Sequence, residues 1–376
     1  MRAARTRCVP FSMMIRTRRT IAYARGWFRT PVDVVEEEVV LDRDGISVPG
    51  TLVRPRSRRT DLPAWVVMHG ITRLGRGHQQ LLRFTRAIAH AGIVAIIPDV
   101  PEWRELNLAP ALSAPSIVAA VRWLRESGVV REEPVGVVGF SFGAPHAVGA
   151  WSDRRLREQV GVACSFGGYC STRRTFHFMM TGKYEFDGRS QWLQPDPYGR
   201  WVVAANYLTA VPGRQNAHDV ADALRELARY SGDVGAAAWD PVYAPKIAEL
   251  RTAIAEERRT LFDLFAIPTR TSTPVPAAAA IGEELEEAAR RMDPSIDPTD
   301  ALGSVPGPVH LLHGRRDHLI PCAESRYLSE ALPIGASHLT VTRLFGHSAQ
   351  ERVPLFSGAV EVPLFARALG SVLGAI

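Results

Sequence analysis

The chain has 376 residues, of which 46% are hydrophobic and 22% charged, a composition typical of a globular protein with a sizeable core. No run of about 18 apolar residues occurs, so the sequence predicts no transmembrane helix. The formal net charge is +6, but beyond residue 30 the charges are mixed and no aromatic-plus-basic recognition motif appears, so we expect no nucleic-acid partner.

Residues 1–30 form a basic N-terminal extension that holds much of the excess positive charge. Arginines stand at positions 2, 5, 7, 16, 18, 19, 25 and 29, with no acidic residue among them. The pair Arg18-Arg19 lacks the uninterrupted apolar stretch of an export signal, because Arg25 and Arg29 break it. We expect a disordered extension, or a start codon assigned too early with Met13 or Met14 as the true start, on a cytoplasmic protein. Export, or attachment to an anionic membrane surface through this segment, is the less favoured alternative.

From residue 32 the sequence predicts two antiparallel strands and then alternating strands and helices. The first two strands, at 32–41 and 45–55, are joined by a turn that ends in Asp44-Gly45. Short apolar runs typical of buried strands follow at 63–70, 93–99, 134–140 and 160–168. Helical segments separate these runs at 79–92, 114–128 and 144–151. This alternation indicates a mostly parallel sheet with right-handed crossovers.

The alternation stops at residue 171 and resumes at residue 304. In between lie three candidate helices and almost no strand signal, the helices being at 217–232, 244–267 and 276–293. The sheet resumes at 308–314 and 337–348, and an amphipathic helix at 357–376 closes the chain. We therefore expect an α/β core made of residues 31–170 and 304–376, with a mostly helical insertion at 171–303.

The segment Gly139-Phe140-Ser141-Phe142-Gly143 matches G-x-S-x-G between a predicted strand and a predicted helix. In this context small flanking residues let the backbone turn sharply and present the serine hydroxyl at the edge of the sheet. Ser141 is therefore a candidate nucleophile, and the alternative is a serine N-cap on an ordinary crossover helix. Ser165 has no glycine two residues before it and no following helix, so we do not expect it to react.

A serine nucleophile needs a base, and the base needs a carboxylate that orients it. Asp317 lies just past the strand at 308–314, and His347 lies near the end of the segment 337–348, just past its strand, where these two groups are needed. The oxyanion that forms during attack also needs two hydrogen-bond donors aimed at one point. The backbone N–H groups of Phe142, after the nucleophile, and of Ile71, after the strand at 63–70, are the candidates.

These segments together resemble the α/β-hydrolase superfamily, and within it the dienelactone-hydrolase and prolyl-oligopeptidase-like serine esterases. The resemblance covers roughly residues 45–170 and 304–376. It implies the α/β-hydrolase fold, a mostly parallel central sheet flanked by helices, with the insertion as a helical cap. It also implies that Ser141 is the nucleophile, His347 the general base and then acid, and Asp317 its orienting partner.

The chain departs from these families in three respects. Dienelactone hydrolases proper use a cysteine nucleophile, whereas position 141 is serine. The long insertion is not part of the minimal fold. His69-Gly70-Ile71 stands in place of the glycine-rich oxyanion segment of the hormone-sensitive-lipase type.

Several residues near the predicted cleft have weaker assignments. Arg73, His78 and Trp103 lie on loops that should border the cleft, so they are candidates for substrate binding, with an ordinary solvated loop as an equal alternative. His313 and His318 flank the predicted acid, and we expect them to make structural hydrogen bonds.

The sequence therefore predicts hydrolysis of a small or medium carboxylic ester through an acyl-serine intermediate. The cysteines at 8, 164, 170 and 322 lack metal-ligand spacing, and no phosphate-binding or dinucleotide-binding motif occurs, so we expect neither metal nor cofactor. An amidase or peptidase, a thioesterase or acyltransferase with the same triad, and a noncatalytic binding protein of the same fold remain alternatives. The sequence leaves the oligomeric state open, a homodimer included.

Overall fold

A computed structural model describes residues 11–29, 32–57, 59–269, 276–344 and 358–376. Its main strands are β1 (Val34–Arg43), β2 (Ile46–Pro55), β3 (Ala64–Met68), β4 (Val94–Pro98), β5 (Val135–Phe140), β6 (Val160–Phe166), β9 (Val309–Gly314) and β10 (Ser337–Thr342). They form one eight-stranded sheet in the order β1-β2-β4-β3-β5-β6-β9-β10. The strands β1 and β2 pair antiparallel, as do β2 and β4, and every other neighbouring pair is parallel. The predicted mostly parallel sheet is thereby confirmed.

The central strands lie deep in the molecule, which explains their continuous apolar sequences. Every residue of β3, β4 and β9 is buried, as parallel strands covered by helices on both faces should be. The helices outside the segment between β6 and β9 are α1 (Phe11–Phe28), α2 (Gln79–His90), α3 (Pro101–Arg104), α4 (Ser113–Ser127), α5 (Gly143–Ala150), α13 (Ala323–Ala331) and α14 (Gly358–Leu373). Side chains of α1, α2 and α14 pack in the cluster on one face of the sheet, and those of α4 and α5 pack in the cluster on the other face.

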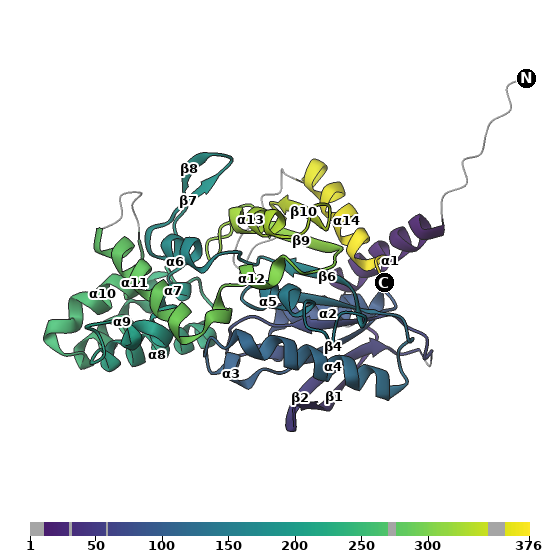
Figure 1. Ribbon diagram of the computed structural model, residues 1–376, viewed down its shortest axis with the longest axis horizontal. Coiled ribbons are helices and arrows are strands. Elements are labelled where there is room, and N and C mark those ends of the chain that lie inside the picture. The colour runs from purple at the N-terminus through teal and green to yellow at the C-terminus, as the bar shows by residue number, and fades with distance from the viewer. Residues whose placement is uncertain (1–10, 30–31, 58, 270–275, 345–357) are drawn as a thin grey trace, which may run out of the picture.

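The segment between β6 and β9 is mostly helical, as the sequence predicts. Its helices are α6 (Thr172–Thr181), α7 (Pro197–Tyr207), α8 (His218–Val234), α9 (Ala244–Ala253), α10 (Arg259–Ala266), α11 (Pro276–Met292) and α12 (Thr299–Leu302). In Figure 1 most of them lie together on the left, at one end of the sheet, and we call this segment the helical insertion. Its buried residues, such as Trp201 and Leu285, belong to the same hydrophobic cluster as Val137 and Val148 of the core.

Two local features of the helical insertion differ from the sequence-based expectation. A hairpin of β7 (Lys183–Phe186) and β8 (Arg189–Trp192) stands where almost no strand signal was recognised, and it projects at the top of Figure 1. The helix expected at 244–267 is two helices, α9 and α10, because the backbone is extended at Ile254. Asp219 holds this break by accepting hydrogen bonds from the Ala255 N–H at 3.1 Å and from Arg258 at 2.8 Å.

Residues 11–28 of the N-terminal extension form the helix α1 and not the expected disordered segment, whereas residues 1–10 and 30 lie outside the described residues. Tyr23 is buried, and a Cβ atom at Gly26 would lie 2.9 Å from the Cβ of His90, so α1 and α2 are in close contact. The helix forms because it has this surface to pack on. No helix in the described part of the chain combines the length and the apolar character that spanning a membrane requires.

Candidate active site

Ser141 occupies the sharp turn between the end of β5 and the start of α5. Its φ angle is +54°, in the left-handed region that residues other than glycine rarely adopt. The Ser141 N–H donates to the Phe166 carbonyl at 2.9 Å, and the Ser141 carbonyl accepts from the Ala144 N–H at 2.9 Å. These two bonds hold the residue at the edge of the sheet where the parallel strands end.

The two glycines of the motif are required because other backbone atoms approach each of them closely. A Cβ atom at Gly139 would lie 2.3 Å from the Gly143 carbonyl oxygen, and a Cβ at Gly143 would lie 2.3 Å from the His69 carbonyl oxygen. Both distances are far shorter than van der Waals contact. Glycine at these positions therefore lets the turn close on itself and lets α5 start directly against the end of β3.

The segment after β3 runs directly beside the serine. A Cβ atom at Gly70 would lie 3.1 Å from the Ser141 Cβ and 3.6 Å from its Oγ. Within the described residues, neither the Ile71 N–H nor the Phe142 N–H donates a hydrogen bond to another protein group. The two predicted oxyanion donors thus lie next to Ser141 and beside it, and neither N–H group has a partner in the described part of the chain.

The side chains of His69 and Trp103 hold this segment in place. The Nδ1 of His69 donates to the Gly70 carbonyl at 2.8 Å, and its Nε2 accepts from the Val100 N–H at 3.2 Å. Burial lowers the pKa of His69, in keeping with a neutral ring that has one donor and one acceptor. Trp103 meets the rings of His69 and Phe142 edge-on, at centroid distances of 5.4 and 5.2 Å.

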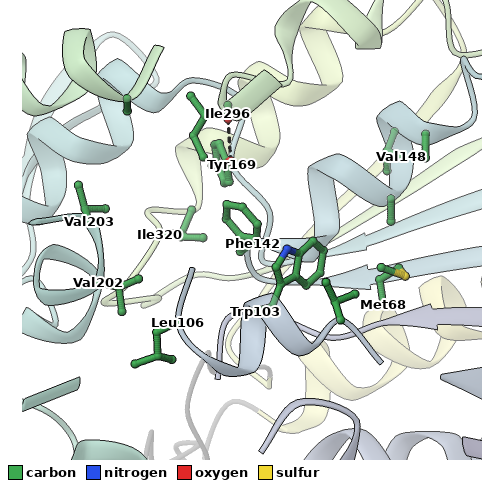
Figure 2. Close-up of a cluster of buried hydrophobic side chains, with 14 of the residues drawn as sticks. Met68, Trp103, Leu106, Phe142, Val148, Tyr169, Val202, Val203, Ile296 and Ile320 are labelled. Atoms are coloured by element: carbon green, nitrogen blue, oxygen red, sulfur yellow. Dashed lines mark hydrogen bonds between the residues drawn. The ribbon is translucent and has the colours of Figure 1, made fainter. Parts of the chain in front are cut away.

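Trp103 is fully buried, and its Nε1 donates to the Ala109 carbonyl at 2.9 Å. Figure 2 shows its ring beside that of Phe142, inside the hydrophobic cluster. This burial leaves no Trp103 surface for a ligand to contact, in contrast to the substrate-binding assignment. Trp103 therefore supports the residue after the nucleophile.

Asp317 follows β9 at the same edge of the sheet and is fully buried. Its Oδ1 accepts hydrogen bonds from the Leu319 and Ile320 N–H groups, both at 2.9 Å. Its Oδ2 lies 3.3 Å from the Nε2 of His313, whose Nδ1 lies 2.6 Å from the Ser325 hydroxyl. The carboxylate orientation is therefore fixed by the loop and by a neighbouring histidine.

The predicted base, His347, lies outside the described residues. The strand that precedes it, β10, pairs parallel with β9 and ends at Thr342. The carboxyl ends of β5, β9 and β10 meet at one edge of the sheet, where α/β folds place their sites. The structure thus brings Ser141, Asp317 and the end of β10 to this edge, and the position of the imidazole stays a prediction.

The first turn of α7, in the helical insertion, contacts the segments on both sides of the site. The Tyr198 hydroxyl donates to the Ile71 carbonyl at 3.0 Å, and the Asp196 N–H donates to the His318 carbonyl at 2.7 Å. A Cβ at Gly199 would lie 2.9 Å from the Leu319 Cδ1. Sequence reasoning missed Tyr198, although Asp196-Pro197 is a recognisable N-cap and first-turn signal for the helix that carries it.

The other residues predicted to lie near the cleft, Arg73, His78 and His318, contact different parts of the chain. Arg73 is exposed and pairs with Asp233 of α8 at 3.0 Å, which joins the core to the helical insertion. His78 is the half-buried N-cap residue of α2, and burial lowers its pKa. His318 bonds through Nδ1 to the Gln194 carbonyl at 2.8 Å, a structural contact. Among the described residues no group of His, Cys, Asp and Glu is placed to hold a metal ion.

A buried histidine lies behind the site. His146 of α5 is 2.7 Å through its Nε2 from the Tyr169 hydroxyl, which donates to the Ile296 carbonyl at 2.8 Å. Figure 2 shows the latter bond as a dashed line. Because Tyr169 uses its proton on that carbonyl, His146 must donate to the hydroxyl. Burial lowers the pKa of His146 to about 3, so the ring is neutral near neutral pH.

Comparison with solved structures identifies the fold. Brefeldin A esterase, a bacterial homologue of human hormone-sensitive lipase, matches with a TM-score of 0.50 and 15% identity, over 99% of this chain and 87% of that one. Est1E from Butyrivibrio proteoclasticus matches with a TM-score of 0.46 and 14% identity, over 89% of this chain and 96% of that one. The 2-hydroxy-6-oxo-6-phenylhexa-2,4-dienoate hydrolase of Rhodococcus sp. strain RHA1 matches with a TM-score of 0.47 and 15% identity, over 89% of this chain and 99% of that one.

No family model and no curated protein matches the chain. The sheet order and the likeness to brefeldin A esterase agree with each other and with the sequence-based expectation. At 15% identity such a likeness bears on architecture alone. The chain therefore has the α/β-hydrolase fold.

Proposed function

We propose that this protein is a serine hydrolase that cleaves small or medium-sized carboxylic esters through an acyl-serine intermediate at Ser141. The observation that carries the proposal is the surroundings of that residue. Ser141 adopts a left-handed conformation at the edge of the sheet, beside the Ile71 and Phe142 N–H groups, which donate to no group among the residues that the structure describes. A serine that served only as an N-cap would need neither the strained turn nor the free donors.

In the proposed mechanism the Ser141 Oγ attacks the ester carbonyl carbon while His347 accepts the hydroxyl proton. The carbonyl oxygen becomes an oxyanion that accepts hydrogen bonds from the Ile71 and Phe142 N–H groups. Collapse of this intermediate breaks the ester bond, and His347 gives the proton to the departing alcohol. Water then repeats the sequence on the acyl-serine. Asp317 holds the imidazole tautomer and stabilises its protonated form.

The helical insertion is proposed as a cap that limits the size of the substrate. Support comes from the start of α7, where Tyr198 and the N-cap residue Asp196 bond to the segments after β3 and β9, on two sides of Ser141. We expect a cap held by these contacts to keep a folded polypeptide from the serine and to admit a small ester. A covered site also strengthens the oxyanion contacts by excluding water.

Fluorophosphonate labelling tests the nucleophile. We expect the wild-type protein and Ser165→Ala to be labelled and Ser141→Ala to remain unlabelled. Ser165 is a matched control, because its hydroxyl is buried in β6 and has no hydrogen-bond partner among the described residues. Labelling that persists in folded Ser141→Ala, or that is absent from the folded wild type, would overturn the proposal.

A comparison of substrates with the same acyl group tests which class of reaction the protein catalyses. We expect kcat/KM for a short-chain aryl ester to exceed that for the anilide and the thioester with the same acyl group. With an added alcohol as competitor, the free acid should remain the main product. A preference for the anilide or the thioester, or predominant transfer to the alcohol, would replace ester hydrolysis with the corresponding alternative.

A further inference from the structure

The helix α1 is held firmly to the core along one side. Tyr23 is buried, and the close approach at Gly26 brings α1 against α2. Arg19 donates to the carbonyls of Leu373 and Ile376 at 2.7 and 2.6 Å. The orientation of α1 is thus fixed, and so is the set of side chains that it turns outward.

The outward side of α1 carries large apolar side chains that the core does not cover. The exposed fractions are 57% for Met13, 53% for Met14, 48% for Ile21 and 79% for Phe28. Positions 14, 21 and 28 recur every seven residues, so they lie along one stripe of the helix. Beside this stripe, α1 and His90 of α2 line a hollow of about 610 Å³.

Arginines lie between these apolar side chains. Arg18 and Arg25 are exposed, line the same hollow and are also seven residues apart. The sequence of α1 contains no acidic residue, and neither arginine pairs with a carboxylate of the described chain. Two uncompensated guanidinium groups thus share one surface with four exposed apolar side chains.

We propose that this surface, made of Met13, Met14, Arg18, Ile21, Arg25 and Phe28, docks on an anionic phospholipid membrane. The boundary between headgroups and acyl chains offers phosphates for the guanidinium groups and apolar volume for the Met, Ile and Phe side chains at the same depth. The length of α1, 18 residues, corresponds to about 27 Å lying in the plane of the membrane.

The charge of this surface and the chemistry of its side chains favour anionic lipid over a second copy of the chain or a nucleic acid. A second copy docked on this surface through a twofold axis would place Arg18 and Arg25 of both copies in one interface, where like charges repel. A nucleic acid would satisfy the arginines but would leave Met13, Met14 and Ile21 in water. Anionic lipid satisfies both kinds of side chain.

Vesicle flotation with the full chain tests the proposal. We expect the wild-type protein to float with phosphatidylcholine vesicles that contain phosphatidylglycerol and not with vesicles of phosphatidylcholine alone. The double variant Arg18→Glu/Arg25→Glu should reduce the bound fraction by about tenfold or more, and Ile21→Glu should reduce it as well. Ile334→Glu is the matched control, because Ile334 is a fully exposed apolar residue outside α1, and it should bind as the wild type does.

Rates with a water-soluble ester separate this proposal from the proposed hydrolase activity, since α1 contributes no residue to the site. We expect all three variants to retain the wild-type rate. Absence of wild-type binding to the anionic vesicles, or equal binding by the double arginine variant, would overturn the membrane proposal. So would light scattering that shows a wild-type dimer converted to a monomer by Ile21→Glu, which would assign the surface to a second copy.

Discussion

At the scale of single residues, the site depends on backbone positions that tolerate little change. A left-handed conformation costs a residue such as Ser141 about 1–3 kcal/mol, and the surrounding structure enforces it. The hydrogen bonds to Phe166 and Ala144 hold the serine, and the absence of Cβ atoms at Gly139 and Gly143 lets the turn close. The strain keeps the hydroxyl at the edge of the sheet instead of within the helix.

Gly70 provides a direct test of this packing. We expect Gly70→Ala to lower kcat by about tenfold or more, because the new Cβ, 3.1 Å from the Ser141 Cβ, would push the Ile71 N–H away from the oxyanion. Gly77→Ala is the matched control on the same loop, since a Cβ there meets no atom within 4 Å. Equal rates for the two variants in steady-state assays would contradict the placement of the oxyanion donor.

Asp317 provides a test of the proposed acid. Asparagine can still accept from the Leu319 and Ile320 N–H groups, so we expect Asp317→Asn to fold, with a melting temperature lowered because its amide N–H would face the Nε2 of His313. Its amide cannot stabilise a protonated imidazole, so turnover should fall by several orders of magnitude, about 10⁴-fold. A near-normal kcat would mean that another carboxylate orients the base.

For single residues, the sequence predicted where a residue lies in the fold better than it predicted which groups surround its side chain. The locations of Ser141 and Asp317 at strand ends follow from motif and element order, and the structure places both at one edge of the sheet. The burial of Trp103 was missed, because a tryptophan on a predicted loop gives no sign of which neighbours will enclose it. The partner of Tyr198 was missed for a similar reason, since its hydroxyl bonds across 127 positions of sequence.

At the scale of elements, the first turn of α7 joins the two loops of the proposed site. We expect Tyr198→Phe to lower kcat by several-fold, because the Ile71 carbonyl loses its donor and the oxyanion segment gains freedom. Tyr207→Phe is the control on the same helix, since its hydroxyl makes a weaker contact, 3.5 Å, with the Leu108 carbonyl away from the serine.

Both variants should lose about 1 kcal/mol of stability or less in urea unfolding. The expected signature of Tyr198 is therefore a change in kcat that exceeds the change produced by Tyr207→Phe at similar stability. Equal kcat values for the two variants would show that α7 does not position the Ile71 segment.

Helices and strands were predicted correctly where the apolar residues recur with a clear period. The prediction failed where the sequence signal was short, or where contacts with distant residues determine the local structure. The hairpin β7–β8 turns at Asp187 and Gly188, with φ angles of +52° and +69°. An Asp-Gly pair is a hairpin signal that could have been recognised. The break between α9 and α10 has no such marker, because Ile254-Ala255 is compatible with a helix. It depends on Asp219, which no local pattern connects to this segment.

At the scale of the whole molecule, the core and the helical insertion form one continuous hydrophobic cluster. Figure 2 shows part of their junction, where Phe142 of the core lies near Tyr169, whose hydroxyl bonds to the Ile296 carbonyl of the helical insertion. The alternation of elements predicted this architecture well. The folding of α1 could not be predicted in the same way, because its helix depends on a surface assembled from α2 and the chain terminus.

A buried histidine at this junction, His146, predicts that the folded protein loses stability in acid. The pKa of His146 is about 3 in the folded protein because of burial, and about 6.5 in the unfolded chain. Between these values the unfolded chain binds one more proton, so this contribution to stability is complete above pH 6.5 and is lost as the pH falls toward 3. The expected slope from His146 is about 1.4 kcal/mol per pH unit.

His146→Gln isolates this contribution, because the glutamine amide can still donate to the Tyr169 hydroxyl. In urea unfolding between about pH 4 and 6, the wild-type free energy of unfolding should fall more steeply with acid than that of the variant, by the slope of one proton. Parallel curves for the two proteins would mean that His146 is not buried as a neutral ring.

The central claim is that Ser141, two backbone donors and a histidine beyond β10 converge at one edge of the sheet. A crystal structure of the fluorophosphonate adduct tests it most directly. We predict phosphorus bonded to the Ser141 Oγ, a phosphonyl oxygen within hydrogen-bond distance of the Ile71 and Phe142 N–H groups, and the His347 imidazole in contact with the adduct and with Asp317. An adduct on another residue, or a His347 ring out of reach of both groups, would contradict the account.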